Sequence, residues 1–393
     1  MRKIGIYNLY WDTMGGGEVN SGALAEVLSQ NDQVTLLGPV EPKKEDFLKY
    51  LDIDLSNCTF LPVDSDDKAT IVSEDFDIFI NHTWMSKAEN RSDNGIYLVM
   101  FPRNPRRFRS YIKSGVFRAL WLITLPFVSL IPRIVPFTQA FRRRVFNESW
   151  LNSYQQIISI SEYSAEWTKR LWKRESDILW PPMNCSTSSE SKEKIILSVG
   201  RFFPENIGHC KRQLDLVEAF RSLHESGKAD GWRLVLAGGC APIGRDYYLK
   251  VRKAAQGLPI DVHVNLPQDD LENLYSKASI YWHATGYGQS ARRFPIWFEH
   301  YGISVIEAMA AGAVPVVLEI GGPAATVRNK IDGVHWGSLE ELINATVFLI
   351  EDQEYLEELK NNAQQRALSF DRRVFDERVK KVFSENREKE KIG

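Results

Sequence analysis

Short apolar runs alternate with longer amphipathic stretches along most of this chain. The runs are rich in Ile, Val and Leu, which is typical of strands buried on both faces of a parallel sheet. In the first half they occupy residues 4–9, 34–37, 78–80, 96–100 and 157–160. In the second half they occupy residues 194–199, 234–237, 262–265, 280–283 and 314–318. Helical patterns lie between many of them, and this alternation predicts an α/β fold with doubly wound, parallel sheets.

A polar, serine-rich stretch at residues 184–193 (NCSTSSESKE) separates the two series of strands. This composition is typical of a linker. We therefore predict an N-terminal domain at residues 1–183 and a C-terminal domain at residues 194–370, each of the Rossmann-like kind. Such sheets bind ligands beyond the carboxyl ends of their strands, so two of them joined by a linker indicate a ligand cleft.

Two glutamates stand eight positions apart in the sequence EHYGISVIEAMAAG, residues 299–312. Glu299 lies just before a predicted helix, and Glu307 lies inside it. The first turn of a helix offers unpaired N–H groups and the positive end of the helix dipole, and together these suit an anion. The arrangement fits a site for a phosphorylated, hydroxyl-rich ligand. It fits equally well a solvated helix whose glutamates are only surface charge.

A glycine-rich loop follows the first predicted strand. Gly15, Gly16 and Gly17 stand between that strand and a helical pattern at residues 19–28, and in this geometry backbone amides can approach a phosphate. The glycines do not fit the pattern G-x-G-x-x-G, and no Walker lysine follows. Dinucleotide and P-loop sites are therefore disfavoured, and a flexible turn is the alternative to a phosphate loop.

Three more candidate residues fall at the carboxyl ends of predicted strands. His82 directly follows the strand at residues 76–81, where a structural and a catalytic role are equally open. Arg201 and Lys211 lie at the corresponding edge of the second sheet. Two cations there could neutralise a diphosphate, the arginine as a bidentate donor and the lysine as a point charge. Solvated surface charge is the alternative.

Charge is segregated along the sequence. The 393 residues carry a formal net charge of −2, so nothing in the overall charge indicates a nucleic-acid partner. Residues 103–144, however, hold ten basic and no acidic side chains around an uncharged, proline-interrupted run of 14 residues at 119–132. That run is shorter than the ~20 residues of a membrane-spanning helix. We favour a segment that lies on an anionic membrane surface over a buried helix or a protein-binding surface.

The cysteines and the start of the chain bear on the compartment. The four cysteines are far apart and lack C-x-x-C spacing, which disfavours a zinc cluster or a disulfide framework and favours a reducing compartment. The first strand runs straight into polar sequence, without the pattern of a signal peptide. We therefore expect a cytoplasmic protein.

Several of these blocks together resemble the retaining glycosyltransferases of the GT-B fold, specifically family 4. The resemblance covers nearly the whole chain. Its anchors are GGGE at residues 15–18, SVGR at 198–201 with Lys211, the E-x7-E signature at 299–312 and GGP at 321–323. Residues 160–164 and 180–182 also look like the segment before the linker in mannosyltransferases that build lipid-linked oligosaccharide. Similar sequences occur among enzymes that assemble bacterial surface polysaccharide.

The resemblance implies a role for each candidate residue. Glu299 would contact hydroxyls of the donor sugar, and Glu307 would contact the ribose. Arg201 and Lys211 would hold the diphosphate and stabilise charge on the leaving group, while His82 would lie near the anomeric carbon. Backbone amides would assist from Gly16 and Gly17 in the first domain, and from Gly302, Ile303, Ser304 and Val305 in the second.

The resemblance also implies an activity. We expect a retaining hexosyltransferase that moves mannose from GDP-mannose to a lipid-linked glycan, such as a polyprenyl-diphosphate-linked acceptor, in polysaccharide or oligosaccharide assembly. Retention in this fold is commonly explained by front-face attack in which the donor phosphate takes the acceptor proton. On that account no protein nucleophile, metal or cofactor is expected.

The same resemblance gives a location and leaves alternatives. The enzyme is expected to attach peripherally to the cytoplasmic face of a membrane, and residues 371–393 are expected to form a helix that crosses back to the first domain. The alternatives are a UDP-sugar donor with another acceptor, a nucleotide-sugar epimerase of the same architecture, and a nucleotide-sugar-binding module without catalysis.

Vesicle co-sedimentation tests the membrane interpretation of residues 103–144. The protein should sediment with phosphatidylserine-containing vesicles at low salt, because basic side chains are attracted to the anionic surface. High salt should release it, because ions screen that attraction. Neutral phosphatidylcholine vesicles serve as the control. A protein that stays in the supernatant with anionic vesicles at low salt contradicts the interpretation.

Overall fold

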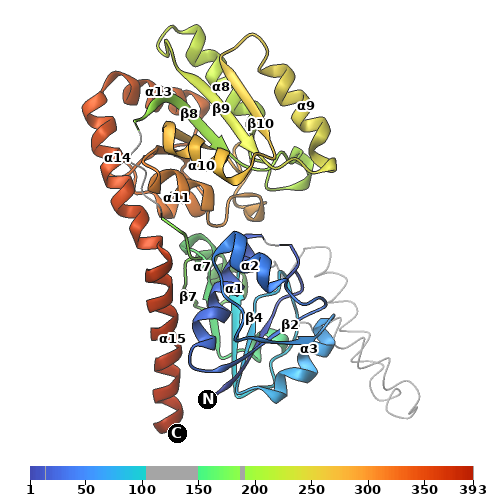
Figure 1. The fold of residues 1–393 in the computed structure, drawn as a ribbon. Helices are drawn as coiled ribbons and strands as arrows, with labels where there is room; N and C mark the ends of the chain where they lie inside the picture. Colours follow the sequence, from blue (N-terminus) through green and yellow to red (C-terminus); the bar gives the residue numbers. More distant parts are fainter. Residues whose placement is uncertain (14, 103–148, 186–190, 393) are drawn as a thin grey trace. The chain divides into compact units, whose positions relative to one another are not determined.

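The computed structural model describes residues 1–13, 15–102, 149–185 and 191–392 (Figure 1). The basic segment predicted at residues 103–144 and the middle of the predicted linker, residues 186–190, lie outside the described residues. The chain divides into two compact units. The N-terminal unit comprises Met1–Ser159 and Ser164–Ile178, and the C-terminal unit comprises Ile160–Tyr163 and Leu179–Gly393.

The N-terminal unit contains a seven-stranded parallel sheet with the strand order β3-β2-β1-β4-β5-β6-β7. Its strands are β1 (Lys3–Tyr7), β2 (Gln33–Gly38), β3 (Thr59–Pro62), β4 (Ile78–Asn81), β5 (Asn94–Val99), β6 (Gln156–Ser159) and β7 (Asp177–Ile178). Its described helices are α1 (Gly16–Ser29), α2 (Lys44–Leu51), α3 (Asp66–Val72), α6 (Ser149–Asn152) and α7 (Glu162–Trp172), with a 3-10 turn at Ser73–Asp75. The sequence pattern did not predict β3 and β7, which are short edge strands with largely exposed residues.

The C-terminal unit contains a six-stranded parallel sheet with the order β10-β9-β8-β11-β12-β13. Its strands are β8 (Glu193–Val199), β9 (Arg233–Gly238), β10 (Ile260–Val264), β11 (Ala278–His283), β12 (Val314–Leu318) and β13 (Val334–Trp336). Its main helices are α8 (Gln213–Glu225), α9 (Arg245–Ala254), α10 (Gln268–Lys277), α11 (Ile303–Ala310), α12 (Gly322–Thr326), α13 (Leu339–Glu351), α14 (Gln353–Ala367) and α15 (Arg372–Ile392). The predicted fold class, two Rossmann-like units with parallel sheets, is confirmed. The crossing of α15 to the first domain stays a prediction.

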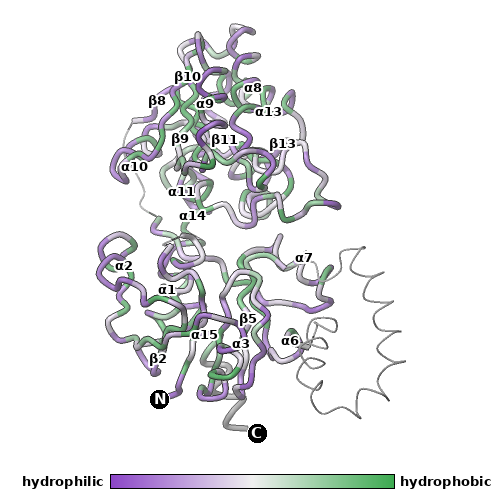
Figure 2. The backbone as a smooth tube through the Cα atoms, turned by 90° about the vertical axis from the view of Figure 1, so that its right-hand side faces the viewer, coloured by the Kyte–Doolittle hydropathy of each residue, from purple (hydrophilic) through white to green (hydrophobic). Residues whose placement is uncertain are grey.

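Burial explains why the apolar pattern of the sequence predicted most of these strands. The residues of β4, β11 and β12 are buried throughout, because helices cover both faces of a parallel sheet. In Figure 2 hydrophobic positions (green) concentrate on the strands of each sheet, and the outer helices carry more hydrophilic positions (purple).

The order of the strands fixes where a ligand can bind in each unit. In the N-terminal sheet the order reverses between β1 and β4, and in the C-terminal sheet it reverses between β8 and β11. At such a switch point the loops that follow the two central strands turn to opposite faces, which leaves a crevice at the carboxyl edge. The segments after β1, β4, β8 and β11 are therefore the ones to search for functional side chains.

An aromatic cluster fills part of the N-terminal core. The Trp150 ring lies 5.5 Å from the Trp172 ring, edge to face, and 5.3 Å from the Tyr97 ring. Tyr97 also contacts Tyr154, whose hydroxyl donates 2.7 Å to Ala88 O. These contacts tie α6, β5 and the end of α7 together.

We expect Trp150→Ala to lower the free energy of unfolding of the N-terminal domain by about 3–5 kcal/mol, because it leaves a cavity inside this cluster. Chemical denaturation followed by circular dichroism measures the change. Leu48→Ala on α2 is the control, since Leu48 is 53% exposed and its removal should change stability by about 0.5 kcal/mol or less. Equal effects of the two substitutions would show that the cluster does not stabilise the domain.

Candidate active site

The loop before α11 is held in place by two glycines. Gly302 caps the helix with φ of 96°, and a Cβ there would lie 2.8 Å from Pro323 Cγ, so only glycine fits. Gly322 N–H donates 2.7 Å to Glu299 O, and a Cβ on Gly322 would lie 2.4 Å from His300 O. The two loops therefore pack backbone against backbone, and this contact fixes the position of Glu299 ahead of the helix.

Glu299 forms an ion pair with Lys211. Lys211 Nζ donates to Glu299 Oε2, and the two side chains are only 19% and 18% exposed. Lys211 comes from the loop between β8 and α8. Its aliphatic stem lies against Gly200, where a Cβ would lie 2.5 Å from Lys211 Cγ. The structure thus brings together two of the predicted site residues, which stand far apart in the sequence.

His283 is a third member of this group that the sequence reasoning missed. It is the last residue of β11, and its Nε2 lies 3.6 Å from Glu299 Oε2 and 3.1 Å from Thr285 Oγ1. Its Nδ1 is buried and has no hydrogen-bond partner among the described residues. The signal was present in the sequence, because His283 ends a strand beside the switch point just as His82 follows one.

The electrostatics of the group favour an ionised Glu299. Burial by itself would raise the pKa of this carboxyl, but the charge of Lys211 and the hydrogen bond with His283 outweigh burial and hold the pKa well below its usual range. For His283 burial dominates and lowers the pKa, although Glu299 acts in the opposite direction. At neutral pH the site therefore contains a charged Lys–Glu pair beside a neutral imidazole.

Arg201 lies at the same edge but is not part of the ion pair. It lies just after β8, separated from it by Gly200, and it is exposed. Its guanidinium lies over the Phe203 ring, 4.7 Å from the ring centroid. It has no ion pair among the residues that the structure describes. This position leaves Arg201 free to meet a ligand, in contrast to Lys211.

A pair of histidines, His209 and His300, borders the site. The sequence patterns did not predict that either is a site residue. The rings of His209 and His300 meet edge to face, with centroids 4.8 Å apart. Burial, together with the neighbouring His209, lowers the pKa of His300 to about 3. Burial also lowers the pKa of His209, which lies within the electrostatic reach of Glu299 and Lys211. Both rings are therefore neutral at physiological pH.

Glu307 lies on α11 and contacts Tyr275. Tyr275 on α10 donates its hydroxyl 2.7 Å to Glu307 Oε2, and burial raises the pKa of Glu307. Tyr275 stacks on Tyr281 of β11, whose hydroxyl lies 3.2 Å from both Val199 N and Val199 O and also contacts Ser304. The glutamate is held by a neutral donor, which leaves its other oxygen for a ligand.

The first turn of α11 offers fewer free amides than the sequence suggested. Val305 N–H donates 3.0 Å to Gly302 O, so it is engaged in the turn itself. Ile303 and Ser304 supply the amides at the start of the helix, where the dipole is positive. An anion at this end would therefore meet Ile303 and Ser304 rather than Val305.

In the N-terminal unit, His82 and the glycine loop meet at α1. His82 follows β4, and its Nδ1 lies 2.5 Å from Ser21 Oγ of α1. Burial lowers the pKa of His82 to about 4, so the ring is neutral at physiological pH. Gly16 and Gly17 form the first turn of α1, where Glu18 Oε2 accepts a 2.9 Å bond from Gly15 N. The predicted residues of this unit thus share the carboxyl edge of β1 and β4.

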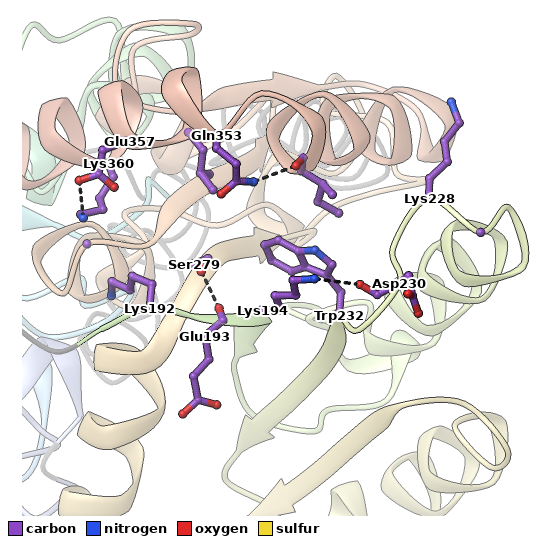
Figure 3. Close-up of a pocket in the computed structure, with 14 residues that line it drawn as sticks. Lys192, Glu193, Lys194, Lys228, Asp230, Trp232, Ser279, Gln353, Glu357 and Lys360 are labelled. Carbon is purple, nitrogen blue, oxygen red and sulfur yellow. Dashed lines mark hydrogen bonds and ion pairs between the residues drawn. The ribbon is translucent and has the colours of Figure 1, made fainter.

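A cavity of about 500 Å³ lies elsewhere in the C-terminal unit (Figure 3). Lys192 and Lys194 near the start of β8, Trp232 just before β9, and Ser279 near the start of β11 line it. These are the amino ends of the strands, opposite to the edge that holds Lys211 and Glu299. This cavity is therefore separate from the candidate chemistry.

Comparison with known proteins finds similarity to glycosyltransferases. Residues 186–366 match the family model described as "Glycosyl transferases group 1". The chain is 29% identical over 191 residues to the GDP-Man:Man(3)GlcNAc(2)-PP-Dol alpha-1,2-mannosyltransferase of Xenopus laevis, covering 44% of this chain and 36% of that protein. It is 27% identical over 267 residues to the Homo sapiens protein of the same name, covering 62% of this chain and 50% of that protein. The chain therefore spans half or less of these relatives.

Solved structures show the same fold over nearly the whole chain. Anabaena Alr3699/HepE in complex with UDP superposes with a TM-score of 0.68 at 15% identity, covering 98% of this chain and all of that one. Sucrose-phosphate synthase (tll1590) from Thermosynechococcus elongatus superposes with a TM-score of 0.68 at 16% identity, covering 98% of this chain and 99% of that one.

The fold is that of solved glycosyltransferases with the GT-B architecture. The match of residues 186–366 to the group 1 model confirms the predicted resemblance. The roles of the individual site residues, and the expectation that no metal or cofactor takes part, stay predictions.

The buried histidines make a prediction about pH. The pKa values of His82 and His300 are lowered on folding, to about 4 and about 3, so below about pH 6.5 the unfolded chain binds protons that the folded chain does not. The free energy of unfolding should therefore fall as the pH drops from 7 to 5, by up to about 1.4 kcal/mol per pH unit for each histidine.

Urea denaturation at pH 7.5, 6.0 and 5.0 measures how steeply the free energy of unfolding changes with pH. The variants His82→Gln and His300→Gln show how much each histidine contributes to that slope. Each substitution should make the slope shallower by the contribution of one proton. A wild-type stability that stays constant or rises on acidification contradicts the prediction.

Proposed function

We propose that this protein is a retaining hexosyltransferase that moves mannose from a nucleotide-diphosphate sugar to a lipid-linked glycan. The observation that carries the proposal is the ion pair between Lys211 and Glu299 at the N-terminal end of α11. It lies within the segment that matches the glycosyltransferase family. It also lies at the carboxyl edge of the sheet, where doubly wound folds bind nucleotides.

The chemistry of the site suits a nucleotide-diphosphate sugar. Lys211 and the exposed Arg201 supply positive charge for a diphosphate, and the amides of Ile303 and Ser304 add hydrogen-bond donors. Ionised Glu299 accepts hydrogen bonds from sugar hydroxyls, and Glu307 can accept them from a ribose. As the bond to the sugar breaks, negative charge grows on the diphosphate, and fixed donors that meet it there lower the barrier.

The donor and the acceptor are proposed from the relatives. The curated relatives are named as GDP-mannose-dependent enzymes that act on dolichyl-diphosphate-linked glycan, and this supports GDP-mannose and a polyprenyl-diphosphate-linked acceptor. A UDP-sugar donor is the second candidate, since the solved neighbours include a complex with UDP-glucose. Retention of configuration is proposed from the resemblance to family 4.

The proposed location is the cytoplasmic face of a membrane, to which the protein binds peripherally. The support is the basic, apolar sequence at residues 103–144, which suits an anionic lipid surface. Among the described residues, no helix combines the length and the apolar character that crossing a bilayer requires.

Substitution of Glu299 tests the proposed chemistry. Glu299→Gln should lower kcat for mannose transfer from GDP-mannose to Man(3)GlcNAc(2)-PP-dolichol by roughly 10²–10³, because it removes a charged group that faces the reacting sugar. The matched control is Glu357→Gln, which removes a carboxylate that pairs with Lys360 and whose side chain is 59% exposed. Full turnover by the Glu299 variant would contradict the assigned role, and a loss shared by the control would point to a general effect on the protein.

Ligand-induced stabilisation tests the donor. GDP-mannose should raise the melting temperature in a concentration-dependent way, because it binds only the folded state, and Lys211→Ala should reduce that rise. UDP-glucose is the competing donor in the same assay. Wild-type protein that neither nucleotide sugar stabilises, and that transfers no sugar from either, would refute the proposed function.

A further inference from the structure

The N-terminal unit contains buried polar atoms that nothing in the described residues satisfies. Asn20 on α1 is 2% exposed, and neither its amide oxygen nor its amide nitrogen has a hydrogen-bond partner within the described ranges. His82 is 1% exposed, and its Nε2 also lacks a partner in the part of the chain that the structure describes. A folded protein rarely leaves three such atoms unpaired, because each unmet hydrogen bond costs stability. A bound ligand or ordered water would satisfy them.

The two side chains border the same end of α1. Asn20 and Ser21 are three and four residues after Gly17, so all three share one face of the helix. Side chains on a helix lean towards its N-terminus, which directs Asn20 and Ser21 towards the first turn. Ser21 Oγ contacts His82 Nδ1. Asn20 and His82 therefore lie beside the glycine turn, at the point where the strand order reverses between β1 and β4.

Ser21 connects Asn8 to His82. Asn8 Nδ2 donates 3.1 Å to Ser21 Oγ, and Ser21 Oγ lies 2.5 Å from His82 Nδ1. When Ser21 donates its hydroxyl proton to Nδ1, the neutral ring carries its own proton on Nε2. In that tautomer the unsatisfied Nε2 of His82 is a neutral N–H donor, and it cannot act as a base.

The chemistry of these atoms selects the kind of ligand. The amide of Asn20 offers both a donor and an acceptor, which suits a hydroxyl group, since a hydroxyl also donates and accepts. A phosphate only accepts, and the buried carboxylate of Glu18 already occupies the start of α1, where Thr13 Oγ1 and Gly15 N donate to it. The surroundings thus favour an uncharged, hydroxyl-rich group over an anion.

We propose that Asn20 and the Nε2–H of His82 form a subsite that binds hydroxyls of a neutral sugar. The inference rests on the proposed transferase function and adds Asn20 as a residue that recognises sugar. Either the transferred sugar or the sugar of the acceptor glycan could supply these hydroxyls, and kinetics separates the two sources.

The first experiment compares two buried asparagines in the same domain. Asn90 is 8% exposed, and its amide bonds to Ser92 O and Ser153 O. Asn90→Leu should lower the melting temperature, because it breaks satisfied hydrogen bonds. Leucine has a volume similar to that of asparagine, so Asn20→Leu should leave the melting temperature unchanged or raise it, because it removes buried polar atoms that make no hydrogen bonds. A drop for Asn20→Leu as large as that for Asn90→Leu would mean that Asn20 supports the fold, and it would overturn the proposal.

The second experiment measures transfer from GDP-mannose to Man(3)GlcNAc(2)-PP-dolichol. Asn20→Leu should lower kcat/KM by about tenfold or more. A rise in KM for the acceptor assigns the subsite to the acceptor glycan, and a rise in KM for GDP-mannose assigns it to the transferred sugar. Unchanged kinetics in a variant of an active wild type would overturn this proposal alone, whereas an inactive wild type would count against the transferase function.

The role of His82 has its own test. The amide nitrogen of glutamine can take the place of Nε2, so His82→Gln should retain more activity than His82→Asn, whose shorter amide takes the place of Nδ1. A His82 that acted as a base would make both variants equally inactive. Equal loss would therefore overturn the assignment of His82 as a neutral donor.

Discussion

The charge of Glu299 is the constraint around which the C-terminal site is built. An ionised carboxylate that is mostly removed from water needs a partner of opposite charge and further hydrogen bonds. Lys211 supplies the charge and His283 the second contact. The three residues come from the loop before α11, the loop after β8 and the end of β11, which meet only because parallel strands deliver their following loops to one edge. A diphosphate that enters this site meets a lysine already paired, so the ligand has to share Lys211 with Glu299.

The two sheets use histidine in the same way. His82 follows β4 and His283 ends β11, and each of these strands lies across the switch point of its sheet. In both cases one ring nitrogen is held by a neighbour and the other is buried without a partner among the described residues. Burial keeps the rings neutral, so these histidines present hydrogen-bonding atoms of fixed direction instead of positive charge.

The cavity at the opposite edge lies apart from the candidate chemistry. Two of its lysines bind backbone carbonyls. Lys192 donates to Ser276 O at the end of α10 and to Ala311 O at the end of α11, where backbone carbonyls have no partners within the helix. Lys194 likewise donates to Asp230 O. These two lysines are therefore engaged in the fold.

The sequence by itself determined the fold class, because a strand that is buried on both faces consists mostly of apolar residues. It also placed Glu299, Lys211 and His82 at strand or helix ends. It did not reveal that Lys211 and Glu299 form one pair, that Arg201 stands apart from it, or that Val305 has its amide engaged. Those facts depend on which loops meet at an edge, and strand order decides this. Nor could the sequence show that Asn20 is buried without a partner among the described residues. An atom is unpaired because of everything around it, and only the tertiary structure supplies those surroundings.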